Sequence, residues 1–146
     1  MLVPPDDLPG MVAWLARETA EMRRRDRNRR REGRIVETKP AEGLYKVRFR
    51  EASGDEPAFD GPWLKVRALS SGGLKIQAEP TVGQWVTVIS ESGELTDGVI
   101  DLSAYFSEND RPHDKNGELV ITVGGMRGHV DADGNVVIEA PSGHLK

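Results

Sequence analysis

The spacing of apolar residues changes at Gly33, and this change most restricts the folds open to the chain. Before Gly33, a stripe recurs at spacings of three and four, which predicts a helix over about residues 10–31 with its first half packed and its second half solvated. The stripe consists of Leu8, Val12, Leu15, Thr19 and Met22. After Gly33, apolar and polar residues alternate between frequent turn residues, which indicates strands. We therefore expect a mainly β chain with one N-terminal helix.

Five strands are expected in the middle of the chain, and five is the number that closes a small OB-like barrel. Their predicted ranges are residues 34–38, 45–50, 63–69, 84–90 and 97–102. Because Trp85 begins the most continuously apolar run, we expect the strand that contains it to be central. Residues 74–78 are expected to add a short edge strand, and residues 52–62 to form a longer mobile loop.

Three further short strands are expected after residues 103–117, a segment rich in Ser, Asn, Asp and Pro that marks a boundary. They are predicted at residues 118–123, 126–130 and 135–140, with turns at residues 124–125 and 131–134. No helix is expected beside them, and strand pairs of this size are marginal in water on their own. Another surface must therefore cover their apolar side chains.

Composition limits the classes of protein that the chain can form. With 146 residues, it is long enough for one domain and its appendages. It is 37% hydrophobic and 30% charged, which is typical of a soluble, turn-rich domain. It has no cysteine, so disulfide bonds and cysteine zinc sites are excluded. We see no secretory signal at the N-terminus, and no run approaches the roughly 20 apolar residues that span a bilayer.

Residues 82–100, VGQWVTVISESGELTDGVI, and then residues 105–112, YFSENDRP, resemble the phage baseplate assembly protein V family. The order of parts agrees over about residues 10–112, where a helix leads through residues 33–38 into a barrel. After residue 112, the resemblance extends only to the general character of the sequence. The motif residues are Gly83, Trp85, Val86, Val88, Gly93, Gly98, Tyr105, Asn109 and Pro112. We expect Gly83 and Gly93 to supply turns beside a buried strand, and Gly98 to open the next strand where a side chain would crowd.

The resemblance implies three parts and a trimer. The parts are a helix with an arginine-rich end over residues 1–33, an OB-fold barrel over residues 34–112, and short strands over residues 113–146 that form a stub of an intertwined trimeric β-helix. Three copies would bring together the apolar side chains of these last strands, which point one way along each strand. These side chains are Leu119, Ile121, Val123, Val136, Ile138 and Ala140.

The resemblance also implies a non-enzymatic, structural function. The chain would be the trimeric hub and spike at the tip of the tail tube in a phage baseplate, and it would help to pierce the host envelope during contraction. Its expected partners are two further copies, tail tube or baseplate hub proteins, a separate spike-tip protein and, transiently, the host outer membrane. It would be made in the host cytoplasm and located at the baseplate tip of the virion.

The end of the chain departs from the family pattern. Spikes of this family usually continue into a longer β-helix and often end in a His-x-His iron apex, which this sequence lacks. Two interpretations stay open: a short spike capped by a separate tip protein, or a truncated sequence. His113, His129 and His144 are spaced too far apart for a metal motif within one chain, and His144 on the three-fold axis is the one candidate ligand. No metal and no other cofactor is expected.

Charge is distributed unevenly, and this supports an alternative function. Residues 1–34 hold nine Arg and six acidic residues, a net +3, whereas residues 35–146 hold eleven basic and eighteen acidic residues, a net −7. The arginine run over residues 23–31 has the charge to bind phosphates, as in a single-stranded nucleic-acid-binding OB-fold protein. The run has no aromatic residue on which bases stack. We therefore favour water or an acidic protein surface as its contact, and nucleic acid is not the expected partner.

No arrangement typical of an enzyme was found in the sequence, so no catalytic residue is expected. Ser103 and Ser107 lie near His113, but proximity within one loop does not make a catalytic triad. Residues 131–135, DADGN, have calcium-loop character, but position 142, the twelfth of such a loop, is Ser142 rather than Glu. We interpret this segment as a β-turn.

Overall fold

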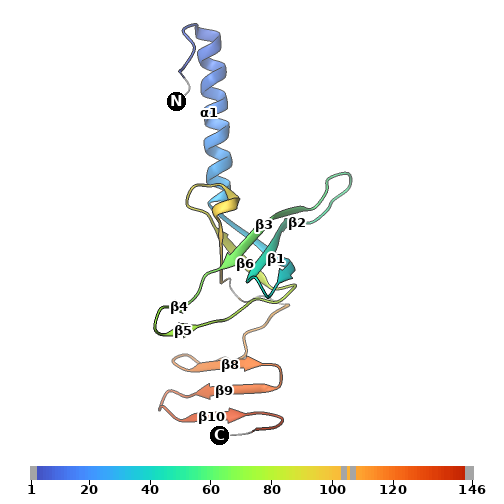
Figure 1. Cartoon of the computed structure of the whole chain (residues 1–146), viewed down its shortest axis with the longest axis vertical. Helices are drawn as coiled ribbons and strands as arrows, with labels where there is room; N and C mark the ends of the chain where they lie inside the picture. Colours follow the sequence, from blue (N-terminus) through green and yellow to red (C-terminus); the bar gives the residue numbers. More distant parts are fainter. Residues whose placement is uncertain (1–2, 103–104, 106–107, 144–146) are drawn as a thin grey trace. The chain divides into compact units, whose positions relative to one another are not determined.

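The computed structural model describes residues 3–102, 105 and 108–143. The chain divides into two compact units, Met1–Ala104 and Tyr105–Lys146. As predicted, the described residues are mainly β, with one N-terminal helix and a closed barrel of five strands (Figure 1).

The helix α1 spans Leu8–Asn28 and begins at a cap, because the side chain of Asp7 accepts a hydrogen bond from the backbone N–H of Gly10 at 3.0 Å. It ends three residues before the predicted limit of residue 31. Arg30 and Arg31 instead begin strand β1, where they pair with Ile89 and Val88. In the described part of the chain, no helix has the length and apolar composition that crossing a membrane requires.

The prediction that the first half of the helix is packed is wrong for a single chain. Most of the stripe is more than half exposed: Leu8, Val12, Leu15 and Met22. The buried residue of the helix is Asn28, at the end next to β1. The helix is therefore held at its C-terminal end, and its apolar stripe faces solvent.

Five strands close the barrel in the order β1-β2-β3-β7-β6, with β6 paired to β1. They are β1 (Arg30–Lys39), β2 (Leu44–Arg50), β3 (Phe59–Val66), β6 (Trp85–Ile89) and β7 (Val99–Leu102). Neighbours run antiparallel except β3 and β7, which are parallel. This arrangement is consistent with the predicted OB-like barrel.

Besides the early start of β1 at Arg30, two further predicted ranges need correction. Strand β3 covers Phe59–Val66 rather than residues 63–69, because Phe59 and Asp60 pair with β2. The expected loop over residues 52–62 therefore ends before Phe59. Strand β7 starts at Val99 because Leu95–Asp97 forms a 3-10 helix, η1. Within the predicted edge strand, only Lys75–Ile76 (β5) is a strand, and it pairs with β4 (Ser70–Ser71) in a separate two-stranded sheet rather than with the barrel.

The barrel core draws apolar residues from all five strands. They are Ile35, Tyr45, Val47, Leu64, Val86, Val88 and Ile100. Trp85 is not among them, because it is 38% exposed at the start of the otherwise buried strand β6. Gly98 is confined by this core, since an added Cβ atom would lie 2.8 Å from Cγ1 of Val88. The prediction of crowding at Gly98 is confirmed.

The second unit contains a three-stranded antiparallel sheet in the order β10-β9-β8. Its strands are β8 (Leu119–Val123), β9 (Met126–Val130) and β10 (Val136–Glu139), close to the predicted ranges. The turn between β9 and β10 is the predicted β-turn, with Gly134 N–H donating to the carbonyl oxygen of Asp131 at 3.1 Å. The carboxylate of Asp131 accepts two further backbone hydrogen bonds, from Asp133 and Asn135, at 2.9 Å each.

Candidate assembly surface and histidine cluster

One face of the C-terminal sheet consists of apolar residues. Residues paired across antiparallel strands share a face, so the pairing gives the membership of each row. The rows are Leu119, Val130 and Val136; then Ile121, Gly128 and Ile138; then Val123 and Met126. Every predicted interface residue on β8 and β10 therefore lies on the same face, and Ala140, just beyond β10, is exposed.

This apolar face is open to solvent in the single chain. The exposed fractions are 57% for Leu119, 53% for Ile121, 67% for Val123, 65% for Val136 and 65% for Ile138. Scattered exposed apolar residues are ordinary, but a contiguous set usually marks an interaction surface. Burying one such side chain completely stabilises a protein by about 1.5–3 kcal/mol relative to full exposure. Burial of this face against another surface would therefore contribute several kcal/mol of stabilising free energy that the single chain lacks.

The opposite face of the sheet carries Val120 and Val137 together with polar residues, among them a cluster of two histidines and a glutamate. His129 pairs with Val120 on β8, and Glu118, two residues before Val120, lies on the same face. Nε2 of His129 lies 2.8 Å from Oε2 of Glu118, and Nε2 of His113 makes a close hydrogen bond to the same oxygen. The two imidazole rings lie with their centroids 4.8 Å apart. The three side chains converge on one point.

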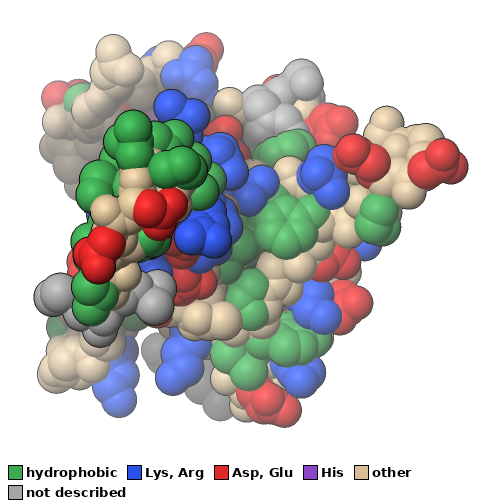
Figure 2. Space-filling model, turned by 90° about the horizontal axis from the view of Figure 1, so that it is seen from above, with side chains coloured by type: hydrophobic (Ala, Val, Ile, Leu, Met, Phe, Trp, Pro, Cys, Tyr) green, Lys and Arg blue, Asp and Glu red, His purple; other side chains and the backbone are tan. Residues whose placement is uncertain are grey.

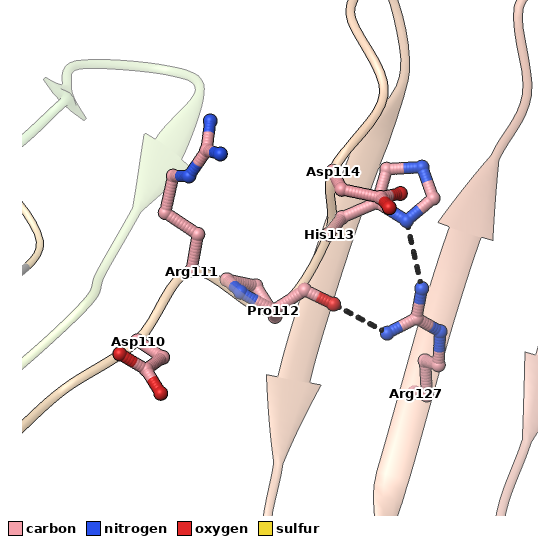
Figure 3. Close-up of a pocket in the computed structure, with 6 residues that line it drawn as sticks. All are labelled: Asp110, Arg111, Pro112, His113, Asp114 and Arg127. Atoms are coloured by element: carbon pink, nitrogen blue, oxygen red, sulfur yellow. Dashed lines mark hydrogen bonds between the residues drawn. The ribbon is translucent and has the colours of Figure 1, made fainter. Parts of the chain in front are cut away.

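Arg127 on β9 holds His113 from the other side (Figure 3). Its guanidinium donates to Nδ1 of His113 at 3.0 Å and to the carbonyl oxygen of Pro112 at 2.9 Å. In a neutral imidazole, one nitrogen accepts and the other donates. Because Nδ1 of His113 accepts from Arg127, its proton is on Nε2, where it is donated to Glu118. An open hollow of about 520 Å³ adjoins this side of His113, lined by Asp110, Arg111, Pro112, Asp114 and Arg127.

Glu118 is the electrostatic centre of the cluster. Hydrogen bonds from His129 and then His113 hold the pKa of its carboxyl group below the ordinary value, against the opposing effect of burial. Its side chain is only 9% exposed. The cluster is consequently a carboxylate screened from water by two imidazole donors.

The prediction that the histidines are too far apart for a common site is wrong for His113 and His129. They are sixteen positions apart in sequence, but β9 folds back beside β8 and brings them together. Part of this arrangement could be predicted from the Gly124-Gly125 turn. The turn fixes the pairing register of β8 and β9, which places His129 near Glu118. The approach of His113 was not visible in the sequence. His144, Ser103 and Ser107 lie outside the described residues.

Two arginines near the end of the helix, Arg24 and Arg25, are paired with acids. Figure 2 shows acidic side chains next to basic ones on the face of the molecule that it draws. Arg24 contacts Glu21 at 2.8 Å and Glu94 at 2.7 Å, and Arg25 contacts Glu21 at 2.9 Å. Hydrogen bonds from these arginines lower the pKa of Glu21 to about 2. Arg24 and Arg25 therefore contact acids of this chain itself, and the expected contact with an acidic protein surface stays a prediction.

The arginine run has no aromatic residue of its own, but the barrel places two aromatic rings beside it. The guanidinium of Arg31 lies 5.0 Å from the ring centroids of both Phe49 and Phe59. Phe59 also lines a hollow of about 390 Å³ together with Arg24 and Arg27. Strand pairing between β2 and β3 produces this arrangement, which sequence reasoning missed.

The residues that carry the family resemblance serve mainly the fold. Gly83 and Gly93 have positive φ angles of 90° and 79°, confirming the predicted turn conformations beside β6. Val86 and Val88 are core residues, whereas Trp85 and Tyr105 are exposed. Asn109 and Pro112 are also exposed. No family model matches the chain, and no curated protein matches its sequence.

Proposed function

We propose that three copies of this chain assemble through the apolar face of their C-terminal sheets into the hub and short spike of a phage tail baseplate. The observation that carries the proposal is the row structure of that face, which leaves five large apolar side chains more than half exposed. The resemblance of residues 82–112 to the baseplate assembly protein V family supports the same assignment.

The two faces of the sheet suit a three-sided assembly. Three sheets arranged around an axis would turn Ile121 and Ile138 inward, and Arg127 and His129 outward toward water. Strands β8 and β10 are the edges of the sheet, and their outer backbone groups would pair with the neighbouring chains. Association would thus satisfy both the apolar surface and the sheet edges.

The stripe on α1 supplies a second apolar surface for three copies. Leu8, Val12, Leu15, Thr19 and Met22 follow successive spacings of four, three, four and three. This is the spacing of the core positions of a coiled coil, in which each helix buries its stripe against its partners. In the proposed trimer, the three helices pack against one another through this stripe.

The proposed function is mechanical. Sheath contraction would drive the assembled spike into the host envelope, and the barrels would form the hub that joins it to the tail tube. Rigidity comes from burial and strand pairing between copies rather than from any catalytic group.

The mass of the protein in solution tests the proposal. Multi-angle light scattering of the full chain should give three times 16.1 kDa, about 48 kDa, and this mass should persist on dilution. A stable monomer across the micromolar range would overturn the assignment, because the exposed rows would then need no partner.

A second function is favoured by one observation, the placement of Arg31 over Phe49 and Phe59. Basic and aromatic groups side by side are the elements of a single-stranded nucleic-acid site. Fluorescence anisotropy of a labelled oligonucleotide tests this alternative. Binding near physiological ionic strength that weakens steeply with added salt would favour it, and the absence of such binding would remove it.

A further inference from the structure

We propose that His113, Glu118 and His129 form a binding site for a transition metal ion of the Zn²⁺ type within a single chain. The inference does not rest on the baseplate function, because all three residues belong to one unit of one chain.

The donor atoms are already close enough to share an ion. One ligand atom from each residue lies within 4.8 Å of the others. In a tetrahedral zinc site, bonds of about 2.0–2.1 Å place the ligand atoms roughly 3.3 Å apart. The distance from Nε2 of His129 to Oε2 of Glu118 is 2.8 Å, so these two groups need to separate by only about half an ångström.

The chemistry of the donors selects the class of ion. Two imidazole nitrogens and one carboxylate oxygen suit Zn²⁺ and neighbouring first-row metals, whereas Ca²⁺ and Mg²⁺ prefer oxygen ligands alone. Three protein ligands leave a fourth position for water or for a group from another molecule. The side chains are ordered by the fold, with exposed fractions of 16% for His113, 9% for Glu118 and 24% for His129.

Arg127 opposes metal binding and provides a sharp test. To coordinate through Nε2, His113 must move its proton to Nδ1, and it then has no lone pair there for Arg127. The hydrogen bond of 3.0 Å between them must break, while Arg127 keeps its bond to Pro112. The arginine charge also repels the ion. Replacing Arg127 with Gln should therefore tighten binding severalfold.

Cobalt absorption measures the site directly. The full chain, stripped of metal with a chelator, is titrated with Co²⁺ and, separately, with Zn²⁺ by calorimetry. We expect one ion per chain and a visible spectrum of tetrahedral or five-coordinate Co²⁺. Glu118→Gln and His129→Ala should each weaken binding at least about tenfold. Circular dichroism confirms that each variant is folded, and Glu118→Gln keeps the shape of the side chain.

A carboxylate outside the cluster provides the matched control. Asp133→Asn removes the charge of an exposed side chain at the turn between β9 and β10 and should leave both affinity and spectrum unchanged. Absence of binding at micromolar metal, or binding that is lost in Asp133→Asn but kept in Glu118→Gln, would overturn the proposal. Light scattering of the same samples reports the oligomeric state separately, so the metal site and the trimer can fail independently.

Discussion

A Cβ atom at Gly93 would lie 2.6 Å from the Cβ atom of Arg25, because the last turns of α1 rest directly on the turn between β6 and η1. Real Cβ atoms do not approach so closely. The same turn is bonded internally, since Gly93 N–H donates to Oγ of Ser90 at 3.1 Å. Gly93 therefore fixes both the shape of the turn and the place where the helix joins the barrel.

Gly93→Ala should destabilise the chain far more than Gly43→Ala. Both residues have positive φ angles, 79° and 65°, so each substitution carries a strain of roughly 1–2 kcal/mol. Only Gly93 has neighbours at the added Cβ position, and Gly43 has nothing within 4 Å. Overpacking adds roughly 1–3 kcal/mol for Gly93→Ala alone. Urea unfolding measures both; equal losses of stability would show that the helix does not rest on this turn.

Ile121→Asp or Ile138→Asp should abolish trimer formation and leave much of the barrel's β signal. A charge buried without a partner costs several kcal/mol, and each ~1.4 kcal/mol changes an association constant tenfold. We expect the midpoint of dissociation, measured by light scattering on dilution, to rise at least about a hundredfold. Thr122→Asp is the matched control, because Thr122 lies on the polar face and pairs with Arg127. A trimer of normal stability in either Ile variant would contradict the assigned inward face.

Leu15→Asp should also weaken the trimer, but without disturbing the barrel. Leu15 lies in the centre of the exposed stripe of α1 and is 51% exposed in the single chain, so the change costs little before association. In packed helices the aspartate would be buried. Ala13→Asp adds the same charge at an exposed position off the stripe. Analytical ultracentrifugation of the two variants should separate them, and an equal effect would exclude packing through this stripe.

The free energy of unfolding should decrease as pH rises above the ordinary pKa of tyrosine, because the hydroxyl group of Tyr45 is buried. Burial and then the hydrogen bond of 2.5 Å to Glu79 raise the pKa of Tyr45 from 10.0 to about 12. Between these values the unfolded chain loses a proton that the folded chain keeps, so deprotonation favours unfolding. The stabilising contribution is complete below pH 10.0 and is lost as pH approaches about 12.

The measurement is the urea midpoint as a function of pH for Tyr45→Phe and Tyr105→Phe. Tyr45→Phe should flatten the alkaline decline, and Tyr105→Phe should not, because Tyr105 is 61% exposed. Identical alkaline slopes in the wild type and Tyr45→Phe would show that this hydroxyl group does not keep its proton in the folded state.

The barrel and the C-terminal strands could be predicted because their signals are local. In β2, buried Tyr45 and Val47 alternate with less buried neighbours, and glycines mark the turns. Strand β1 began earlier than predicted because Arg30 and Arg31 look like the end of a solvated helix. Their strand conformation is imposed by pairing with β6, which residue spacing does not report. For these two residues, pairing with a strand distant in the sequence determines the conformation, and the local residue spacing does not.

The histidine cluster shows the same limit at the level of a site. His129 and Glu118 meet through the register of one hairpin, which the sequence indicates in part. His113 arrives from a segment without regular structure, and its position depends on Arg127 and on the backbone of Pro112. Such an arrangement has no period and no fixed spacing. It becomes visible only when the strands are in place.

The strands of the C-terminal sheet are nearly equal in length, with five, five and four residues in β8, β9 and β10. Each strand is therefore about 15 Å long, and each additional strand would extend the ladder by about 4.8 Å. Duplicating one hairpin would lengthen the ladder by roughly 10 Å. The duplication would preserve the length of the strands and the separation of the apolar face from the opposite face. The length of the ladder could thus change through small in-frame duplications, without redesign of the barrel that precedes it in the chain.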